Sequence, residues 1–318
     1  MRFPEWRSLG TIKLMSETRR VARQHLISQV LLRRFTMPGT KGSGWQVAPF
    51  DLNNPDRHHK LRSPRECGWV EDFVAFDSGS VEELWGSVER RAPEAFAAID
   101  SGTPFDNPDH TEILRDLVVL HLVRSHRYRD VYLNSVTKAR EKVRRGLIQD
   151  HSEALGREAL RQTGLHLTGP QALGRFADRL IASTEPTQDH ASGKLFRTSI
   201  EDMFRKVQAK VSSWQLELLT PQEGQFLVSD TPAITLRRDG NYTRFGMAVG
   251  DADTIMLPLD PYHLVALGPE NRAIQAPKTL VDELNGVQVL AANQYIYMHP
   301  RSGLEAFVRD GLRYRSGR

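Results

Sequence analysis

Apolar residues recur every three to four positions through most of the chain before residue 212, which is the period of an amphipathic helix. The pattern predicts helices over residues 21–35, 80–99, 111–145, 152–163, 170–183 and 195–211. Ser80 is a suitable N-cap for the second of these, and Glu83, three residues later, completes a capping box. The first two-thirds of the chain are therefore expected to be rich in helix.

The pattern changes near Ser213, where short apolar runs alternate with Gly, Pro, Asp and Asn. Such runs are typical of strands joined by turns. We predict strands over 214–219, 225–229, 233–236, 255–259, 263–267 and 295–298, helices over 279–292 and 304–312, and an earlier antiparallel pair over 45–51 and 69–76. We expect an α+β fold, in which a helix-rich N-terminal two-thirds packs with a mainly antiparallel sheet from the C-terminal third.

The length and composition are those of a folded globular protein. The chain has 318 residues, of which 39% are apolar and 26% charged. We expect a loose arm over residues 1–19 and a single α+β domain over 20–318, with a helical subdomain over 80–211 as the alternative. No stretch approaches the roughly 20 apolar residues needed to span a bilayer, and the N-terminus lacks the apolar core of a secretory signal. We therefore expect a cytoplasmic protein without a membrane partner.

Charge and cysteine content exclude few function classes. The net charge is +4, and only nine of the 43 basic residues are Lys. Arginine suits phosphate and carboxylate recognition, but an arginine-rich genome would produce the same bias. The single cysteine, Cys67, excludes an internal disulfide and a cysteine-rich zinc site. We find no nucleotide-binding glycine loop, expect no metal site, and leave the cofactor and the oligomeric state open.

The first predicted helix carries a polar face. His25, Gln29 and Arg33 follow each other at intervals of four residues, so on a helix they share one side. A His and an Arg on one face could act as acid/base and charge stabiliser in phosphoester chemistry, or bind an anion. The alternative is a solvated face. Leu31 and Phe35, on the other side, are expected in the core.

The longest predicted helix carries an apolar stripe that contains two basic side chains. The stripe consists of Leu114, Leu117, His121, Arg124, Tyr128 and Val131. A buried Arg is costly unless it is paired, so Arg124 should meet a carboxylate, with Glu89, Glu82 and Asp230 as candidates. Either a cleft wall or a structural ion pair would satisfy this requirement. His126 and Arg127 lie off the stripe and are expected to face solvent.

Two polar positions in the C-terminal third are candidates for a site. Ser229 and Asp230 end a predicted strand before a Thr-Pro turn, where polar groups often serve binding or catalysis. The carboxylate of Asp230 could equally form a turn by bonding backbone. Asn285, on a helix, could bind a ligand or only a neighbouring loop.

The segment Gln24–Phe35, QHLISQVLLRRF, resembles the opening signature of the domain of unknown function 4238 family, which reads His, aromatic, Val, Pro, Gln and later Leu-Arg-x-Phe. Five further segments resemble that family in the same order: 81–89, 121–127, 226–232, 257–261, and Leu284-Asn285 followed by Ala291 and Tyr295. Leu26 and Ser28 depart from its usual aromatic residue and proline. The resemblance implies the fold and a bacterial origin, and no activity can be carried over from it.

Two functions remain open. One is a phosphoester- or nucleic-acid-acting enzyme, nuclease-like, with His25, Arg33, Arg124 and Asp230 as catalytic residues. The other is a non-enzymatic binding or interaction module that recognises an anionic ligand. In either case Gln29, His121, Glu89, Ser229 and Asn285 are the expected binding residues. We also expect the N-terminal His/Arg face to meet the strand end at residues 229–232, either as a site or as a structural clasp. Whether His25, Arg33, Arg124, Glu89 and Asp230 converge in one pocket distinguishes the two functions.

Overall fold

A six-stranded mixed sheet forms the centre of the protein, seen in a computed structural model that describes residues 22–42, 44–57, 59–240 and 242–315. Its order is β12-β6-β11-β10-β8-β9, and only the β12–β6 pair is parallel. The strands are β6 (Gln215–Pro221), β8 (Ile234–Asp239), β9 (Tyr242–Phe245), β10 (Thr254–Asp260), β11 (His263–Gly268) and β12 (Arg272–Ala276). The loose arm expected over 1–19 lies outside the described residues.

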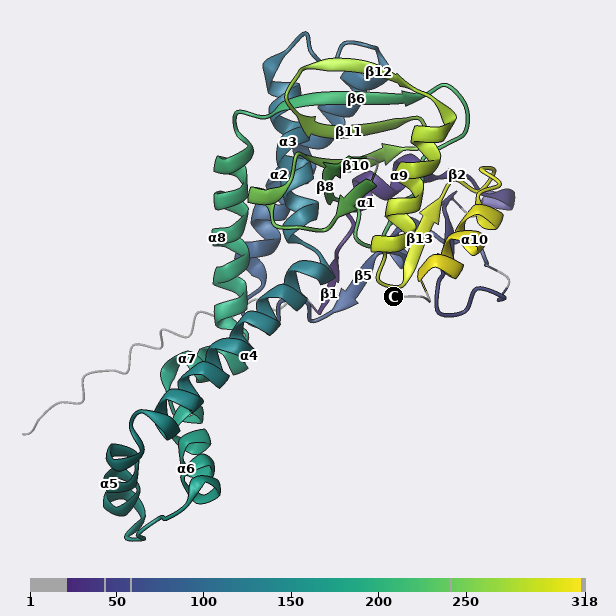
Figure 1. Cartoon of the computed structure of the whole chain (residues 1–318). Coiled ribbons are helices and arrows are strands. Elements are labelled where there is room, and N and C mark those ends of the chain that lie inside the picture. Colours follow the sequence, from purple (N-terminus) through teal and green to yellow (C-terminus); the bar gives the residue numbers. More distant parts are fainter. Residues whose placement is uncertain (1–21, 43, 58, 241, 316–318) are drawn as a thin grey trace, which may run out of the picture.

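Helices cover both faces of this sheet, because its central strands are apolar on both sides. Ile255 and Leu257 of β10 point into the core that contains α2 (Gly79–Asp100) and α3 (Pro108–Val123). Met256 between them points into a second core beneath α9 (Lys278–Ala291). The period-two alternation of a strand thus divides one run of apolar residues between two cores. Figure 1 shows α9 in front of the sheet and α2 and α3 behind it.

A smaller sheet joins the two ends of the chain. Its order is β4-β13-β7, built from β4 (Ala48–Asp51), β13 (Tyr295–Met298) and β7 (Val228–Ser229). The final helix, α10 (Glu305–Arg315), packs on it through Val308. Two short ribbons complete the N-terminal part: β1 (Arg23–His25) with β5 (Trp69–Glu71), and β2 (Met37–Pro38) with β3 (Trp45–Gln46). The α+β class is therefore confirmed, with strands in the N-terminal part as well.

The helix predicted over 21–35 is wrong in its first half. Residues 23–25 form β1, and helix α1 spans only Gln29–Leu32, followed by a 3-10 turn at Arg33–Phe35. The amides of Leu26 and Ile27 both donate to the carbonyl of Gly68, at 2.7 and 3.2 Å, which holds this segment extended. Leu31 and Phe35 are fully buried, as predicted.

The helix predicted over 111–145 is two helices. Helix α3 ends at Val123, Arg124 leaves the helical region with a ψ of 59°, and Ser125 caps α4 (His126–Gln149) by accepting from the amide of Tyr128 at 3.2 Å. Leu114, Leu117, His121 and Arg124 of the predicted stripe are buried. Val131 is 54% exposed instead, because α4 leaves in a new direction.

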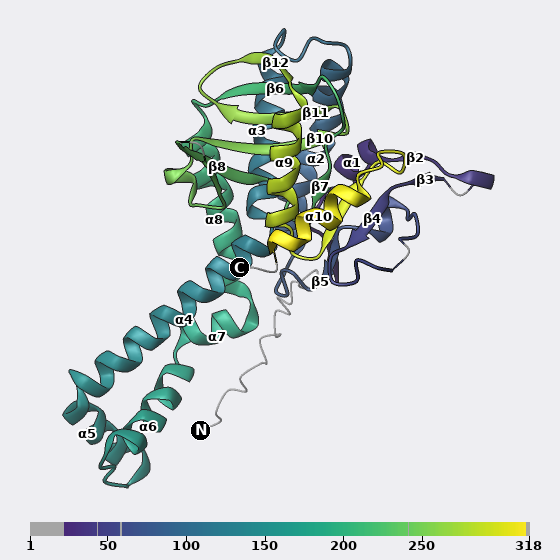
Figure 2. The same cartoon turned by 45° about the vertical axis from the view of Figure 1, so that its right-hand side comes forward.

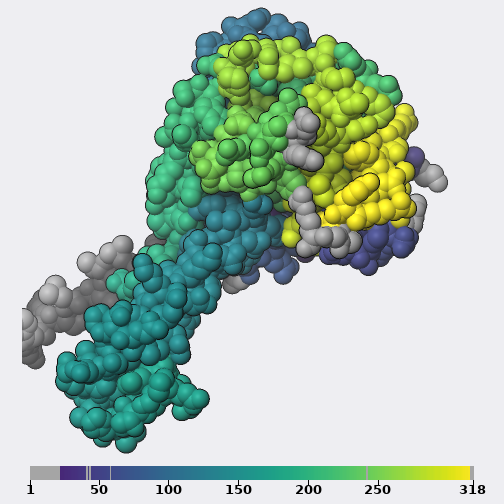
Figure 3. Space-filling view, viewed as in Figure 1, coloured from purple at the N-terminus to yellow at the C-terminus, as the bar shows by residue number. Residues whose placement is uncertain are grey.

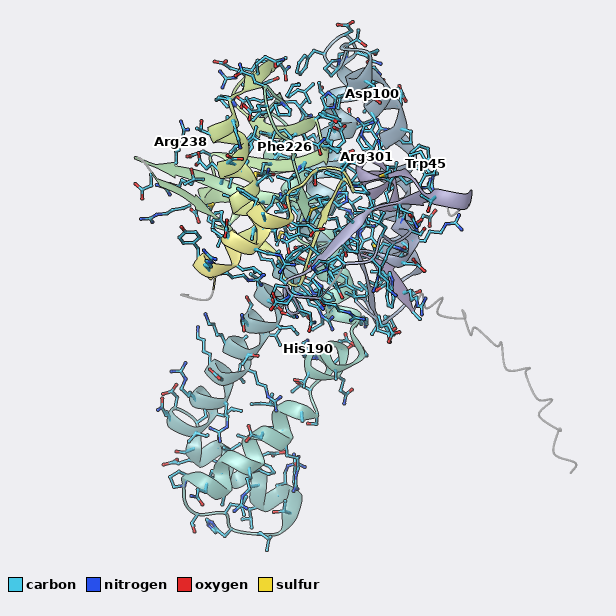
Figure 4. The ribbon with its side chains drawn as sticks, turned by 90° about the vertical axis from the view of Figure 1, so that its right-hand side faces the viewer. Trp45, Asp100, His190, Phe226, Arg238 and Arg301 are labelled. Carbon is cyan, nitrogen blue, oxygen red and sulfur yellow. The ribbon has the colours of Figure 1, made fainter. Side chains whose placement is uncertain are left out.

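Helices α4 to α7 form an arm that projects from the body (Figures 1 and 2). After α4 the chain forms α5 (Ser152–Thr163), α6 (Pro170–Ala182) and α7 (Glu185–Ser192), and α8 (Lys194–Val211) returns it to the body. Leu155, Ala159, Phe176 and Ala177 give the arm its own small core. Figure 4 shows His190 at the base of the arm, where its Nδ1 lies 3.3 Å from the hydroxyl of Tyr132. Among the described residues, no helix is both long and apolar enough to cross a membrane.

We predict that Leu31→Ala lowers the free energy of unfolding by about 2–5 kcal/mol, because a fully buried Leu leaves a cavity when truncated. Leu133→Ala is the matched control, since Leu133 is 40% exposed on the arm, and it should change the value by less than about 0.5 kcal/mol. Urea unfolding followed by circular dichroism measures both. Equal midpoints for the two variants would contradict the core position of α1.

Candidate functional site

Arg124 is buried at the break between α3 and α4, and only 2% of it is exposed. Its Nη2 donates to Oε1 of Glu89 at 2.7 Å, and its Nε donates to the carbonyl of Leu26 at 3.2 Å. The guanidinium carbon lies 4.9 Å from the ring centroid of Trp85. The predicted pairing of Arg124 with a carboxylate is confirmed, and Glu89 is the partner. These contacts occupy the guanidinium inside the protein.

His25 lies at the end of β1, half-buried beside this ion pair. Its Nε2 is 3.3 Å from the amide nitrogen of Gln29, so the predicted pair does meet, although across a turn and not along a helix. Burial lowers the pKa of His25, a hydrogen bond with the backbone of Arg65 opposes that shift, and nearby Arg124 adds to it. The imidazole is therefore neutral near pH 7.

Glu82 completes what we call the N-terminal polar cluster, which consists of His25, Gln29, Glu82, Glu89 and Arg124. Burial raises the pKa of Glu82, while the charge of Arg124 opposes the rise and that of Glu89 adds to it. Its Oε1 is buried and has no hydrogen-bond partner among the described residues. The cluster thus contains a His with a lowered pKa and a Glu with a raised one. A lowered pKa favours the neutral, proton-accepting form of the imidazole, and a raised pKa favours the protonated, proton-donating form of the carboxyl, which are the two roles that an acid/base site needs.

His121 lies wholly inside the protein and joins α3 to the start of α1. Its Nε2 accepts from the amide of Ser28 at 3.2 Å and lies 3.1 Å from the Ser28 hydroxyl. Its Nδ1 is 2.8 Å from the carbonyl of Leu117, which assigns the proton to Nδ1. Burial lowers the pKa of His121 to about 3, and the charge of Arg124 adds to the effect. The side chain fastens the segment that contains Ser28.

Arg33 does not join the cluster: it is exposed on the 3-10 turn, and its predicted place on one face with His25 is wrong. Because α1 begins only at Gln29, the neighbouring Arg34 turns inward. Arg34 donates to Asp100 at 2.7 and 3.0 Å and to Asp260 at 3.0 Å. Asp100, Asp260 and His263 have ligand atoms within 4.8 Å of one another, which would suit a cation. The Arg34 guanidinium already neutralises these carboxylates, so we assign no metal site there.

Asp230 serves the backbone of a distant loop. Its carboxylate accepts from the amides of Asn293 and Gln294, both at 2.7 Å, and from that of Tyr295 at 2.9 Å. Burial raises the pKa of Asp230, and these three hydrogen bonds oppose the rise. The carboxylate thus bonds backbone, as in the turn-former alternative, but the backbone belongs to the loop before β13.

Ser229 and Asn285 fasten strand β7 to helix α9. The amide and the hydroxyl of Ser229 both donate to Oε1 of Gln288, at 3.0 and 2.7 Å. Asn285 accepts from the amide of Leu227 at 3.0 Å and donates to the carbonyl of Gln225 at 2.9 Å. Both side chains are at most 1% exposed. Their hydrogen bonds are made within the fold, and Gln288 is a partner that the sequence pattern did not identify.

The N-terminal segment and the strand end at residues 229–232 meet at a cavity of about 120 Å³. Its walls include Leu26, Trp69, His126, Asp230 and Tyr295. No contact among the described residues joins His25 to Asp230. His126 is half-buried here and not solvent-facing as predicted, because Ser125 starts a new helix. Burial lowers the pKa of His126, and the charge of Asp230 opposes that shift.

A groove opens where the arm leaves the body, and we call it the α4 groove. It comprises two cavities of about 410 and 280 Å³ that share Arg127, Val131, Thr231 and Ala291 in their walls. Figure 3 shows the start of the arm emerging directly below the sheet. The larger cavity is lined by apolar side chains from α3, α8 and the sheet, among them Leu122, Val123, Met203, Val207, Ile234 and Met247. Its volume is in the range of small-molecule sites, about 300–1,000 Å³.

Three basic side chains also line the larger cavity of the α4 groove: Arg127, Lys206 and Lys210. The Arg127 guanidinium lies against Gly246, where an added Cβ would come within 2.5 Å of it. Within the described part of the chain, no hydrogen bond or ion pair engages any of these three cations. The sequence carried a weak signal for this site, since Met203, Lys206, Val207 and Lys210 follow the helical period of one face.

The chain belongs to the family described as "Protein of unknown function (DUF4238)", whose model matches residues 23–302. The resemblance seen in the sequence is thereby confirmed over the body and the arm. No curated protein and no solved structure matches the chain. The function must therefore be argued from the site itself.

We predict that His121 makes the protein less stable in acid. The ordinary pKa of His is 6.5, whereas that of His121 in the folded protein is about 3. Below pH 6.5 the unfolded chain binds a proton that the folded chain does not, so stability is lost as the pH falls, on the order of 1.4 kcal/mol per pH unit.

Nuclear magnetic resonance of the imidazole rings measures this prediction. The His121 signals should stay constant between about pH 7.5 and about pH 5, a range in which an ordinary His changes its charge. His166 on the arm is exposed and provides a solvent-accessible reference in the same spectrum. A His121 titration near neutral pH would contradict its buried position.

Proposed function

We propose that this protein is a binding module that recognises an anionic ligand in the α4 groove. The observation that carries the proposal is the presence of three cations, Arg127, Lys206 and Lys210, that have no ion-pair partner among the described residues and lie beside an apolar cavity of about 410 Å³. A charge beside a low-dielectric wall acts more strongly on a ligand than the same charge in open water. An anion with an apolar body would satisfy both features.

The helical geometry brings these cations together. Lys206 and Lys210 are one turn apart on α8, and Arg127 comes from the first turn of α4. Both helices contribute apolar neighbours to the same wall, Val207 and Val131. A ligand that contacts all three cations would therefore bridge the two helices at the base of the arm.

Binding explains the polar residues better than catalysis does. Of the four residues expected to be catalytic, Arg33 is exposed away from the cluster, and Arg124 and Asp230 are engaged inside the protein. Only His25 keeps a position that suits chemistry. The alternative of an anion-binding module needs none of these residues to react.

We predict that anilinonaphthalene sulfonate, an anionic apolar dye, binds the folded protein at one saturable site. The double variant Lys206→Glu/Lys210→Glu should weaken its Kd at least about tenfold, or about 1.4 kcal/mol, because two attractive charges become repulsive. Arg205→Glu is the matched control, as Arg205 is exposed on the same helix and is absent from the α4 groove. Fluorescence titration measures the three Kd values. Equal affinity in all three proteins would refute the proposal.

A second candidate function is a nuclease-like hydrolase at the N-terminal polar cluster. It is favoured by the position of His25 and Glu82 beside the Arg124–Glu89 ion pair, where burial lowers the pKa of His25 and raises that of Glu82. In this case Glu82, and not Asp230, would be the catalytic carboxyl group. The substrate would be a phosphodiester, with nucleic acid as the partner.

We predict that, if this second function holds, labelled single-stranded RNA or DNA is cleaved by the purified protein, assayed with and without Mg²⁺. His25→Gln should then lower the rate by about 10²–10⁴-fold, the usual contribution of a general base, with an unchanged melting temperature. No cleavage by the unsubstituted protein would exclude the hydrolase. Loss of stability in His25→Gln would identify His25 as a structural clasp between β1 and the turn before β5.

A further inference from the structure

The interior of the α4 groove offers little to a polar ligand. The Ser125 hydroxyl donates to the carbonyl of Leu122 at 2.8 Å and accepts from the amide of Tyr128. The Thr235 hydroxyl donates to the carbonyl of Met247 at 2.8 Å, and the Tyr128 hydroxyl bonds Ser199. These three hydroxyls are already satisfied within the protein, and Thr231 is a further hydroxyl-bearing residue in the wall. A buried sugar or base would lose its hydrogen bonds to water without regaining them there.

The apolar walls are aliphatic and adaptable. Met203 and Met247 line the groove beside Leu122, Val123, Val207 and Ile234. Methionine side chains are unbranched and fill irregular space, so they fit chains of different shape. Among the residues that the structure describes, Tyr128 is the only aromatic one in the lining of this cavity, which gives no platform on which a flat base could stack from both sides.

The charged side chains at the border of the α4 groove determine which head group the ligand carries. Arg127, Lys206 and Lys210 are exposed on this border and form no ion pair within the described part of the chain. The planar fork of an arginine matches a carboxylate bidentately, and two lysines one helical turn apart can reach the same group. A ligand that fits both the cations and the apolar wall therefore has an anionic head and an aliphatic body in one molecule.

We propose that the ligand of the α4 groove is a single-chain aliphatic carboxylate. The carboxylate binds at Arg127, Lys206 and Lys210, and the hydrocarbon chain lies along Met203, Val207 and Ile234. This inference rests on the proposed function, because it names the ligand class of the same site. It goes further in excluding nucleotides and flat aromatic acids as the preferred ligand.

The test is a calorimetric titration of the full chain with hexanoate, octanoate, decanoate and dodecanoate, each below its micelle concentration. Every added CH₂ that enters the groove should tighten the Kd about fourfold, the equivalent of about 0.8 kcal/mol per buried CH₂. The gain should stop once the cavity is full. Affinity that does not depend on chain length, while the sulfonate dye still binds, would overturn the aliphatic ligand and leave the anion site standing.

Two further titrations isolate the head group. Decyltrimethylammonium carries the opposite charge on a chain of the same length, and it should bind at least about tenfold more weakly than decanoate. Equal binding would overturn both this inference and the proposed function. Decyl phosphate tests the choice of carboxylate, and tighter binding than decanoate would overturn that choice.

Variants place the ligand in the α4 groove. Met203→Trp fills the apolar wall and should weaken decanoate at least about tenfold, whereas Arg205→Trp on the outer side of α8 should leave it unchanged. Lys206→Glu is a surface change that tests the same site should Met203→Trp fail to fold. Analytical ultracentrifugation tests whether a second copy of the chain occupies the groove instead. If the protein self-associates, Met203→Trp abolishes the self-association and decanoate does not bind, then a second copy fills the groove and the proposal is overturned.

Discussion

The burial of the Arg124 charge is the constraint on which the rest of the structure depends. A guanidinium that is 2% exposed is stable only if its donors are satisfied. Glu89 of α2 and the carbonyl of Leu26 provide the acceptors, so α2, α3 and the N-terminal segment must meet at one point. The backbone leaves the helix at this residue, and Ser125 starts α4 in a new direction. The arm follows from that break, and so does the α4 groove beside it.

A second feature of the fold is that polar side chains provide hydrogen-bond partners for the backbone groups of short strands and irregular segments. Strand β7 has only two residues, so the amides of Leu227 and Ser229 donate to the side-chain oxygens of Asn285 and Gln288 of α9. Asp230 does the same for the loop before β13, and His121 for the start of α1. Buried amides need such partners. This explains why several polar residues that resemble catalytic groups in the sequence have a structural role in the fold.

The three cations of the α4 groove differ from these residues. Arg124 and Arg34 point inward and meet carboxylates, whereas Arg127, Lys206 and Lys210 border an apolar cavity and meet none among the described residues. Charges whose partners lie within the fold contribute to its geometry. Charges beside an apolar cavity wall are the ones that a ligand can use, which is why the proposed function rests on the groove and not on the His/Arg motif of the sequence.

Local periodicity determined the α+β class, the arm helices over 152–163 and 170–183, and most strands of the C-terminal third, because a repeat of 3.6 or 2 residues is a property of one element. It did not predict α7, β9 or β12. It placed Leu31 and Phe35 on an apolar face, which packing against other elements buries. It also required a carboxylate for Arg124, since the cost of burying a charge does not depend on the fold. The tertiary structure decided the features that the spacing of apolar residues along the sequence cannot encode. The amide of Ser28 bonds a histidine 93 residues away, so the chain at His25 stays extended and α1 starts late. That late start exposes Arg33 and turns Arg34 inward. In the same way, the break at Arg124 leaves Val131 exposed and opens the α4 groove, because the direction of a new helix depends on what packs against its first turn.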